Sequence, residues 1–192
     1  MLQEKFKDYK IILGSQSPRR RELLAGLDIE FEAVSLQVDE SFDPTLQAHH
    51  ITDFLCKKKA AAYSFQADNE ILITSDTIVW WQNQALNKPI DAKDAYRLLK
   101  LLQGSEHEVI TSVAVNTLQK SVVFHDVTQV SFHPLTDEEI SYYVNKYQPL
   151  DKAGAYGVQE WIGYVGVAEL KGSYFNVIGL PVDKLYQTLK AF

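Results

Sequence analysis

The sequence predicts an α/β protein with a mixed β-sheet. Three features carry this prediction: an opening strand, tight loop and helix; later helical segments that alternate with strand-like segments; and one hairpin between two segments rich in Val and Thr. Parallel strands need long crossover connections such as helices, whereas a hairpin joins antiparallel neighbours. Both strand orientations are therefore expected in one sheet.

The first half of the chain begins with an apolar run from Tyr9 to Leu13, which indicates a strand. A tight loop through Gly14 and Ser15 leads to a helical pattern from Arg19 to Leu27. Further along, the sequence predicts a short strand over Phe31 to Ser35, a helix within Thr45 to Phe65, and strands over Ile71 to Thr74 and Ile78 to Trp81. The last two strands flank the polar trio Ser75, Asp76 and Thr77.

The second half carries clearer boundary signals. Asp91 is a suitable cap for a helix that runs to Leu102, and Gly104 stands where helices often end in the left-handed conformation. His107 to Thr117 and Lys120 to Phe132 predict the hairpin, with its turn at Leu118 and Gln119. Thr136 and Glu139 have the capping-box spacing for a helix that ends near Lys146. The Gly-rich stretch from 154 to 179 predicts short strands and functional loops, and Pro181 starts a final helix.

Composition excludes several classes of protein. With 46% hydrophobic and 23% charged residues, and no apolar run near the roughly 20 residues that a membrane span needs, we expect a soluble chain with no membrane contact. The first ten residues do not resemble a secretory signal, and Cys56 is the only cysteine, so a cytoplasmic location is expected. A net charge of −6 argues against nucleic-acid binding, which needs clustered Lys and Arg.

The segment Gly14-Ser15-Gln16-Ser17-Pro18-Arg19-Arg20-Arg21 is the most informative part of the chain. With Ser17 as N-cap and Pro18 as the first helical residue, three arginines fall in the first turn, where the helix dipole disfavours cations. A phosphate held by the backbone N–H groups and the arginines would reverse this penalty. The same pattern is compatible with a solvated basic helix start.

One segment closely resembles the opening signature of the Maf family: Leu13-Gly14-Ser15-Gln16-Ser17-Pro18-Arg19-Arg20-Arg21-Glu22-Leu23-Leu24. The resemblance continues in order through blocks that span nearly the whole chain: Val38-Asp39-Glu40, Leu55 to Ala60, Ser75-Asp76-Thr77, Leu86-Asn87-Lys88-Pro89, Asp151 to Gln159, and Gly172-Ser173-Tyr174 to Pro181.

Several expectations follow from the resemblance. Residues 1–192 should form a single Maf-like nucleotide pyrophosphatase domain. Its architecture should be a twisted mixed β-sheet with flanking helices in two lobes around a central cleft, similar to inosine triphosphate pyrophosphatases. The implied activity is the metal-dependent hydrolysis of a pyrimidine nucleoside triphosphate, dTTP or UTP, with modified pyrimidine nucleotides as further candidates, to the monophosphate and pyrophosphate. A house-cleaning or cell-division-linked role is the biological expectation.

The resemblance also implies roles for single residues. Asp76 would accept a proton from the attacking water, and Glu40 with Asp76 would hold a divalent cation, Mg²⁺ or Mn²⁺, whose preference for oxygen ligands suits two carboxylates. Substrate would be bound by Ser15, Ser17, Arg19, Arg20, Lys59 and Lys88. Taken without the resemblance, the residues favour other interpretations: Asp76 as a turn former or helix cap, Glu40 as part of a solvated acidic turn with Asp39 and Asp43, and Lys57 to Lys59 as an exposed helix face.

Base selection is implied at three positions: Thr77, Gln159 and Arg19 match the subgroup that acts on dTTP and UTP. An amide such as Gln159 can donate and accept hydrogen bonds toward a base edge at once. Glu160 and Trp161 stand where the family commonly has Gly after the Gln, and Asn87 stands where Gly is frequent. These departures bear on substrate preference more than on the reaction.

Two other functional classes remain open on the sequence alone. A nucleotide sensor in cell division would bind without turnover, but it has little need for a base beside a metal site. A nucleic-acid-binding module would need a broad basic surface. The five histidines lack the spacing of a zinc site and are expected to serve structure. We expect a homodimer, for which the paired Trp80 and Trp81 offer a contact; a core tryptophan beside a partly exposed one is the other account.

Overall fold

The computed structural model describes every residue from Met1 to Phe192. It contains seven strands, eight α-helices and one 3₁₀ helix. In chain order they are α1 (Leu2–Lys5), β1 (Lys10–Leu13), α2 (Pro18–Ala25), β2 (Glu32–Ala33), α3 (His49–Ala61), β3 (Glu70–Trp81), β4 (Gln84–Leu86), α4 (Ala92–Leu102), β5 (Glu106–Asn116), β6 (Ser121–Phe132), α5 (Asp137–Tyr147), η1 (Ala153–Ala155), α6 (Trp161–Gly166), β7 (Val167–Lys171), α7 (Tyr174–Ile178) and α8 (Val182–Ala191). None of these helices is both long enough and apolar enough to cross a bilayer.

The seven strands form one mixed sheet, which confirms the predicted fold class. The strand order is β2-β1-β3-β5-β6-β7, with β4 paired to β3. Strand β1 runs parallel to β2 and to β3, whereas β4 runs antiparallel to β3 and β7 antiparallel to β6. The predicted hairpin is β5–β6, and its turn is closed by the Thr117 N–H, which donates to the Lys120 carbonyl at 2.8 Å.

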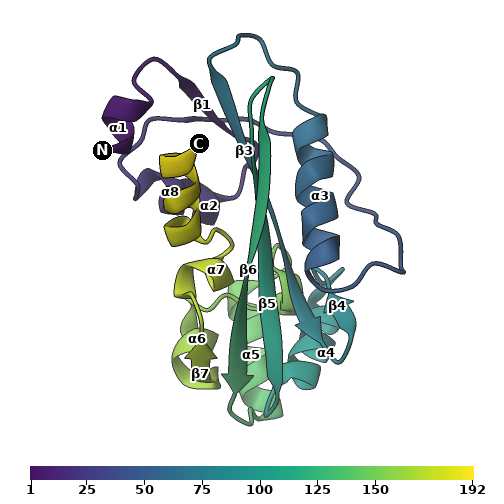
Figure 1. The fold of residues 1–192 in the computed structure, drawn as a ribbon. Helices are drawn as coiled ribbons and strands as arrows, with labels where there is room; N and C mark the ends of the chain where they lie inside the picture. Colours follow the sequence, from purple (N-terminus) through teal and green to yellow (C-terminus); the bar gives the residue numbers. More distant parts are fainter. The chain divides into compact units, whose positions relative to one another are not determined.

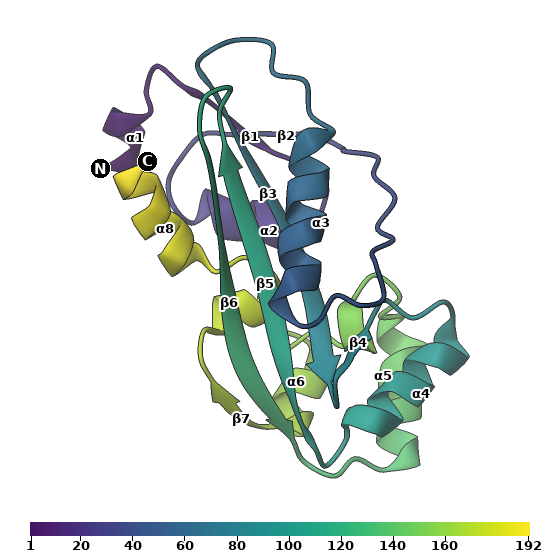
Figure 2. The ribbon, with the colours of Figure 1, turned by 45° about the vertical axis from the view of Figure 1, so that its right-hand side comes forward.

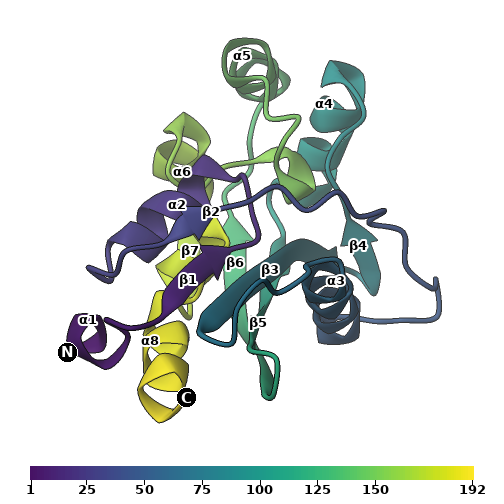
Figure 3. The same cartoon turned by 90° about the horizontal axis from the view of Figure 1, so that it is seen from above.

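The chain divides into two compact units. Unit 1 comprises residues 1–76, 111–126 and 179–192. Its core is formed by apolar side chains from α1, β1, α2, β3, β5 and α8 and from the segments next to these elements: Leu2, Phe6, Ile11, Leu13, Leu24, Ile29, Ile71, Ile73, Val113, Val115, Leu180, Leu185 and Leu189. Helices α1 and α8 bring the two chain ends side by side (Figures 1 and 3), and the Lys5 ammonium donates to the carbonyls of Leu189 and Lys190 at 3.1 and 2.7 Å.

Helix α3 packs alongside β3 in unit 1 (Figures 1 and 2). Its buried residues recur at helical spacing on one face: Ile51, Thr52, Leu55, Cys56 and Lys59. Two polar contacts join this face to the sheet: the Thr74 hydroxyl donates to the Cys56 carbonyl at 2.8 Å, and the hydroxyls of Thr52 and Ser112 are 2.6 Å apart. A single charged side chain, Lys59, is thereby carried into the interior.

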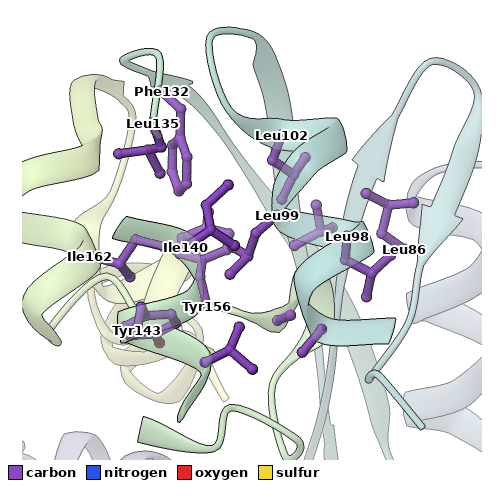
Figure 4. Packing of buried hydrophobic residues seen from close by; sticks show 14 of the residues in the cluster. Leu86, Leu98, Leu99, Leu102, Phe132, Leu135, Ile140, Tyr143, Tyr156 and Ile162 are labelled. Atoms are coloured by element: carbon purple, nitrogen blue, oxygen red, sulfur yellow. The ribbon is translucent and has the colours of Figure 1, made fainter. Parts of the chain in front are cut away.

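Unit 2 comprises residues 77–110 and 127–178 and has its own core. Figure 4 shows how the inner faces of α4 and α5 meet there. The buried residues of this core include Leu86, Leu98, Leu99, Leu102, Phe132, Leu135, Ile140, Tyr143, Tyr156 and Ile162. The boundaries of both helices agree with the sequence prediction: Asp91 accepts a hydrogen bond from the Asp94 N–H, Gly104 has a φ of 63°, and Thr136 with Glu139 forms the complete capping box.

Some expected elements were wrong in extent. Strand β2 has only two of the five residues expected over Phe31 to Ser35, whereas α3 lies within the stretch from Thr45 to Phe65, as predicted. The Gly-rich stretch holds mainly short helices, with β7 as its single strand. Most importantly, the two strands expected around Ser75 to Thr77 are one unbroken strand, β3. The polar trio therefore lies within the sheet and not in a loop.

Candidate active site

A buried lysine joins two carboxylates in unit 1. The Lys59 ammonium lies 2.6 Å from an oxygen of Asp76 and 2.8 Å from an oxygen of Glu40. Its position in the last turn of α3 explains why it alone of the lysine run enters the site, because Lys57 is exposed and Lys58 turns toward Asp39 and the Ser41 carbonyl. Three residues predicted from the sequence thus meet at one point.

Asp76 owes its position to the alternation of side chains along β3. Thr74 and Asp76 lie on the face that α3 covers, as their bonds to Cys56 and Lys59 show. Ser75 lies on the opposite face, where its hydroxyl donates to the Gly179 carbonyl at 3.2 Å. The next residue, Thr77, follows the same alternation and points away from the Asp76 face. The expectation that Asp76 follows a strand end is corrected: it is a strand residue, 6% exposed.

Burial dominates the electrostatics of Asp76. Loss of hydration disfavours its charged form and raises the pKa of the carboxyl group, while the Lys59 ammonium and the Arg20 guanidinium oppose the shift and the Glu40 carboxylate adds to it. A carboxylate with a raised pKa is a stronger proton acceptor than an exposed aspartate. The cations Lys59 and Arg20 act in the opposite direction and favour the ionised form that a general base needs.

The start of α2 has the predicted arrangement, with one difference. Ser17 occupies the N-cap position and Pro18 the first turn, but the Ser17 side chain makes no capping hydrogen bond. Instead, its backbone N–H donates to the Ser15 hydroxyl at 3.3 Å. The loop before it passes close to the sheet: a Cβ on Gly14 would lie 2.5 Å from Leu36 and 2.9 Å from Thr74, so a larger residue would displace these side chains.

Arg20 links the start of α2 to Asp76. Its Nε donates to the Gly179 carbonyl at 2.9 Å, the same oxygen that accepts from Ser75. Desolvation lowers the pKa of the guanidinium, and the charges of Asp76 and Glu40 oppose that shift; an arginine in such surroundings still carries its charge. Gly179 itself was not singled out as a site residue from the sequence, because its contribution is a main-chain carbonyl that no side-chain motif reports.

The residues of unit 1 offer one set of donors for a hard divalent cation. The carboxylates of Glu40 and Asp76 both contact the same ammonium group, so their oxygens converge on a point where positive charge is already favoured. Carboxylate oxygens are the ligands that Mg²⁺ and Mn²⁺ prefer. The donor chemistry therefore fits the ion that the resemblance implies.

The other three predicted residues belong to unit 2. Thr77 lies in β3, Lys88 is exposed between β4 and α4, and Gln159 is half-buried just before α6. The loop that carries Gln159 is tied down by Glu160, which pairs with Lys152 at 3.1 Å and accepts a hydrogen bond from the Tyr143 hydroxyl. Tyr143 in turn accepts from the Gly157 N–H at 3.0 Å. Glu160, which departs from the family pattern, thus anchors the loop that carries Gln159.

Comparison with known proteins identifies relatives along almost the whole chain. Residues 10–192 match the family described as Maf-like protein. A dTTP/UTP pyrophosphatase of Flavobacterium psychrophilum is 51% identical over 187 residues, covering 97% of this chain and 96% of the relative. One of Bacteroides fragilis strain YCH46 is 53% identical over 184 residues, covering 95% of each. Among solved structures, the Ham1 protein of Staphylococcus aureus superposes with a TM-score of 0.54 at 14% identity, over 95% of this chain and 98% of that one, so the two share a fold.

Proposed function

We propose a function for this chain on the basis of its family: it belongs to the Maf family. The protein is a nucleoside triphosphate pyrophosphatase that converts dTTP or UTP to the monophosphate and pyrophosphate. The observation that carries the proposal is the contact of buried Asp76 with Lys59, beside Arg20 from the start of α2. A proton acceptor next to a concentration of positive charge is what hydrolysis of a triphosphate requires. The pyrimidine preference rests on the names of the Flavobacterium and Bacteroides relatives, which are dTTP/UTP pyrophosphatases, and on Thr77 and Gln159.

In the proposed reaction, Asp76 takes a proton from a water molecule whose oxygen attacks a phosphorus atom of the substrate. The bond between the α- and β-phosphates breaks, and its electron pair leaves with pyrophosphate. Arg19, Arg20 and Lys59 balance charge on the phosphate oxygens, with Lys88 as a further contact and Ser15 and Ser17 as hydroxyl donors. Gln159 reads the base edge from a loop that Glu160 holds in place.

A divalent cation is part of the proposal. Glu40 and Asp76 would hold it, and when bound it would neutralise charge on the phosphates. Removal of divalent ions with EDTA should abolish turnover, and added Mg²⁺ or Mn²⁺ should restore it. Undiminished pyrophosphate release in EDTA would show that no such ion takes part.

The decisive experiment measures pyrophosphate release from UTP and dTTP with Mg²⁺, against ATP, GTP and methylated or pseudouridine triphosphates. Asp76→Asn should lower kcat by several orders of magnitude while nucleotide binding stays within a few-fold, because the amide keeps the shape but not the basicity. Asp126→Asn is the matched control, since Asp126 is also a buried strand aspartate paired with a lysine, Lys184. A fully active Asp76→Asn enzyme, or folded wild type that releases no pyrophosphate, would refute the proposal.

Two further expectations belong to the proposal. We place the enzyme in the cytoplasm, which agrees with a single cysteine, Cys56, that is buried and free. We also propose that the whole chain acts as one Maf-like domain and forms a homodimer. Sedimentation of the purified protein tests the dimer, and a monomer at all concentrations contradicts it.

A further inference from the structure

Two imidazoles and a carboxylate gather in unit 1 at residues that the proposed reaction does not use. His49 and Asp53 come from the first turns of α3, and His125 comes from β6. One potential ligand atom from each lies within 4.8 Å of the other two, and all three side chains are half-buried. His125 Nδ1 is 3.8 Å from an oxygen of Asp53, and the rings of His49 and His125 stack with centroids 4.2 Å apart.

We propose that His49, Asp53 and His125 form a binding site for a transition-metal ion of the zinc class. Two nitrogen donors and one carboxylate oxygen are a donor set that suits Zn²⁺, Co²⁺ or Ni²⁺ and disfavours Mg²⁺, which prefers oxygen ligands alone. Three protein ligands also leave a fourth position of a tetrahedral ion for water. This site is distinct in chemistry from the pair of acids Glu40 and Asp76.

The backbone presents these ligands in a suitable way. His49 and Asp53 are four residues apart on α3 and therefore project from the same face of the helix. At a metal–nitrogen distance of about 2.1 Å, two ligands of one tetrahedral ion lie about 3.4 Å apart. The ligand atoms lie within 4.8 Å of one another, so the three side chains must move closer together to hold one ion.

Neighbouring groups hold the ligands in place as a second layer of contacts. The Ser112 hydroxyl donates to Asp53 Oδ1 at 2.5 Å, and Thr52 on α3 bonds the same hydroxyl at 2.6 Å. On β6, the His125 carbonyl accepts a hydrogen bond from the Lys184 ammonium at 3.2 Å. Hydrogen bonds of this kind to ligating carboxylates orient them and strengthen metal binding.

Zinc titration of the metal-free protein, without nucleotide and with excess Mg²⁺, tests the site. Wild type should bind one equivalent of Zn²⁺, show a visible absorption band with Co²⁺ in its place, and melt at a higher temperature with the ion. His49→Ala and His125→Ala should each weaken zinc binding about tenfold or more and lose the Co²⁺ band. His133→Ala is the matched control, because His133 is an exposed histidine of unit 2 and should leave both readouts unchanged.

Two more variants make the outcome unambiguous. Ser112→Ala should weaken zinc binding by roughly tenfold without removing a ligand. Asp76→Asn should bind zinc as wild type does; loss of binding there would place the ion at the proposed catalytic acids and overturn the inference. Wild type that binds no zinc, or equal zinc affinity in wild type, His49→Ala and His125→Ala, would overturn it as well. Because no substrate is present, none of these results depends on whether the protein hydrolyses nucleotides.

Discussion

Asp76 and Lys59 show how a single pair of side chains balances opposing electrostatic effects. Burial of the Asp76 carboxylate disfavours its charge and raises its pKa, and the adjacent ammonium partly restores the charged form. A buried charge without a partner is far more costly than a paired one. Lys59 is thus a positioning and charge-balancing residue for Asp76 as well as a proposed phosphate contact.

Replacement of Lys59 should move the pH dependence of the reaction. Asp76 must be ionised to accept a proton, so activity should fall on the acid side at a pH above the usual aspartate value of about 3.9. Lys59→Gln removes the cation that lowers the Asp76 pKa, and the acid limb of the kcat/KM profile should therefore shift to higher pH. Lys57→Gln, an exposed neighbour on the same helix, should leave the limb in place.

An unshifted acid limb in Lys59→Gln would mean that the group titrating there is not Asp76. A shift of equal size in Lys57→Gln would assign the effect to overall charge instead of the contact. Both variants are compared at constant ionic strength, because salt screens exposed charges far more than buried ones.

The sequence was sufficient to select Lys59, Glu40 and Asp76 as candidate site residues. It did not predict that the Lys59 ammonium contacts both carboxylates. Their positions matched a family pattern, whereas their contact depends on the last turn of α3 reaching the face of β3 where Asp76 lies. In the cluster of His49, Asp53 and His125, only the first two are close in the sequence; His125 comes from a distant strand, and no linear motif links it to them. Such groupings are properties of packing.

At the scale of elements, the two predicted helix starts differ in a way that can be measured. Thr136 and Glu139 exchange both hydrogen bonds of a capping box at α5, whereas the Ser17 side chain makes no capping bond at α2. Thr136→Ala should therefore lower the free energy of unfolding by about 1 kcal/mol. Ser17→Ala should change it by less than about 0.5 kcal/mol and should raise KM for UTP, because its proposed role is toward phosphate.

Urea unfolding of both variants, alongside steady-state kinetics, separates the two roles. Equal destabilisation by the two substitutions would show that Ser17 caps α2 in solution. An unchanged KM in Ser17→Ala would remove that hydroxyl from the proposed binding site.

Strand β3 shows why local sequence signals fail at a functional site. Ser75, Asp76 and Thr77 interrupt an apolar run, and three polar residues in sequence are typical of a loop. In the structure the strand continues because tertiary contacts satisfy these groups: Gly179 accepts from Ser75, and Lys59 pairs with Asp76. Capping residues such as Asp91 were predictable for the opposite reason, since their bonds are made within a few residues.

At the scale of the whole molecule, two hydrophobic cores share three long strands. Ile71 and Ile73 of β3 belong to the core of unit 1, and Val79 of the same strand belongs to that of unit 2. Strands β5 and β6 likewise continue from one unit into the other along the chain. Because the same strands supply side chains to both cores, loss of one core should weaken the other, and we expect the two units to unfold in one cooperative transition.

The tryptophans make this expectation testable. Trp80, Trp81 and Trp161 all lie in unit 2, whereas far-UV circular dichroism reports on the helices of both units. Leu189→Ala truncates a fully buried side chain in the core of unit 1 and should cost about 2–5 kcal/mol. The tryptophan fluorescence midpoint in urea should fall by the same amount as the dichroism midpoint, although no tryptophan lies in the altered unit. Leu118→Ala, at the exposed hairpin turn of unit 1, should move neither midpoint appreciably. A dichroism curve that splits in two while the fluorescence midpoint stays at its wild-type value would show that the units unfold independently despite their continuous strands.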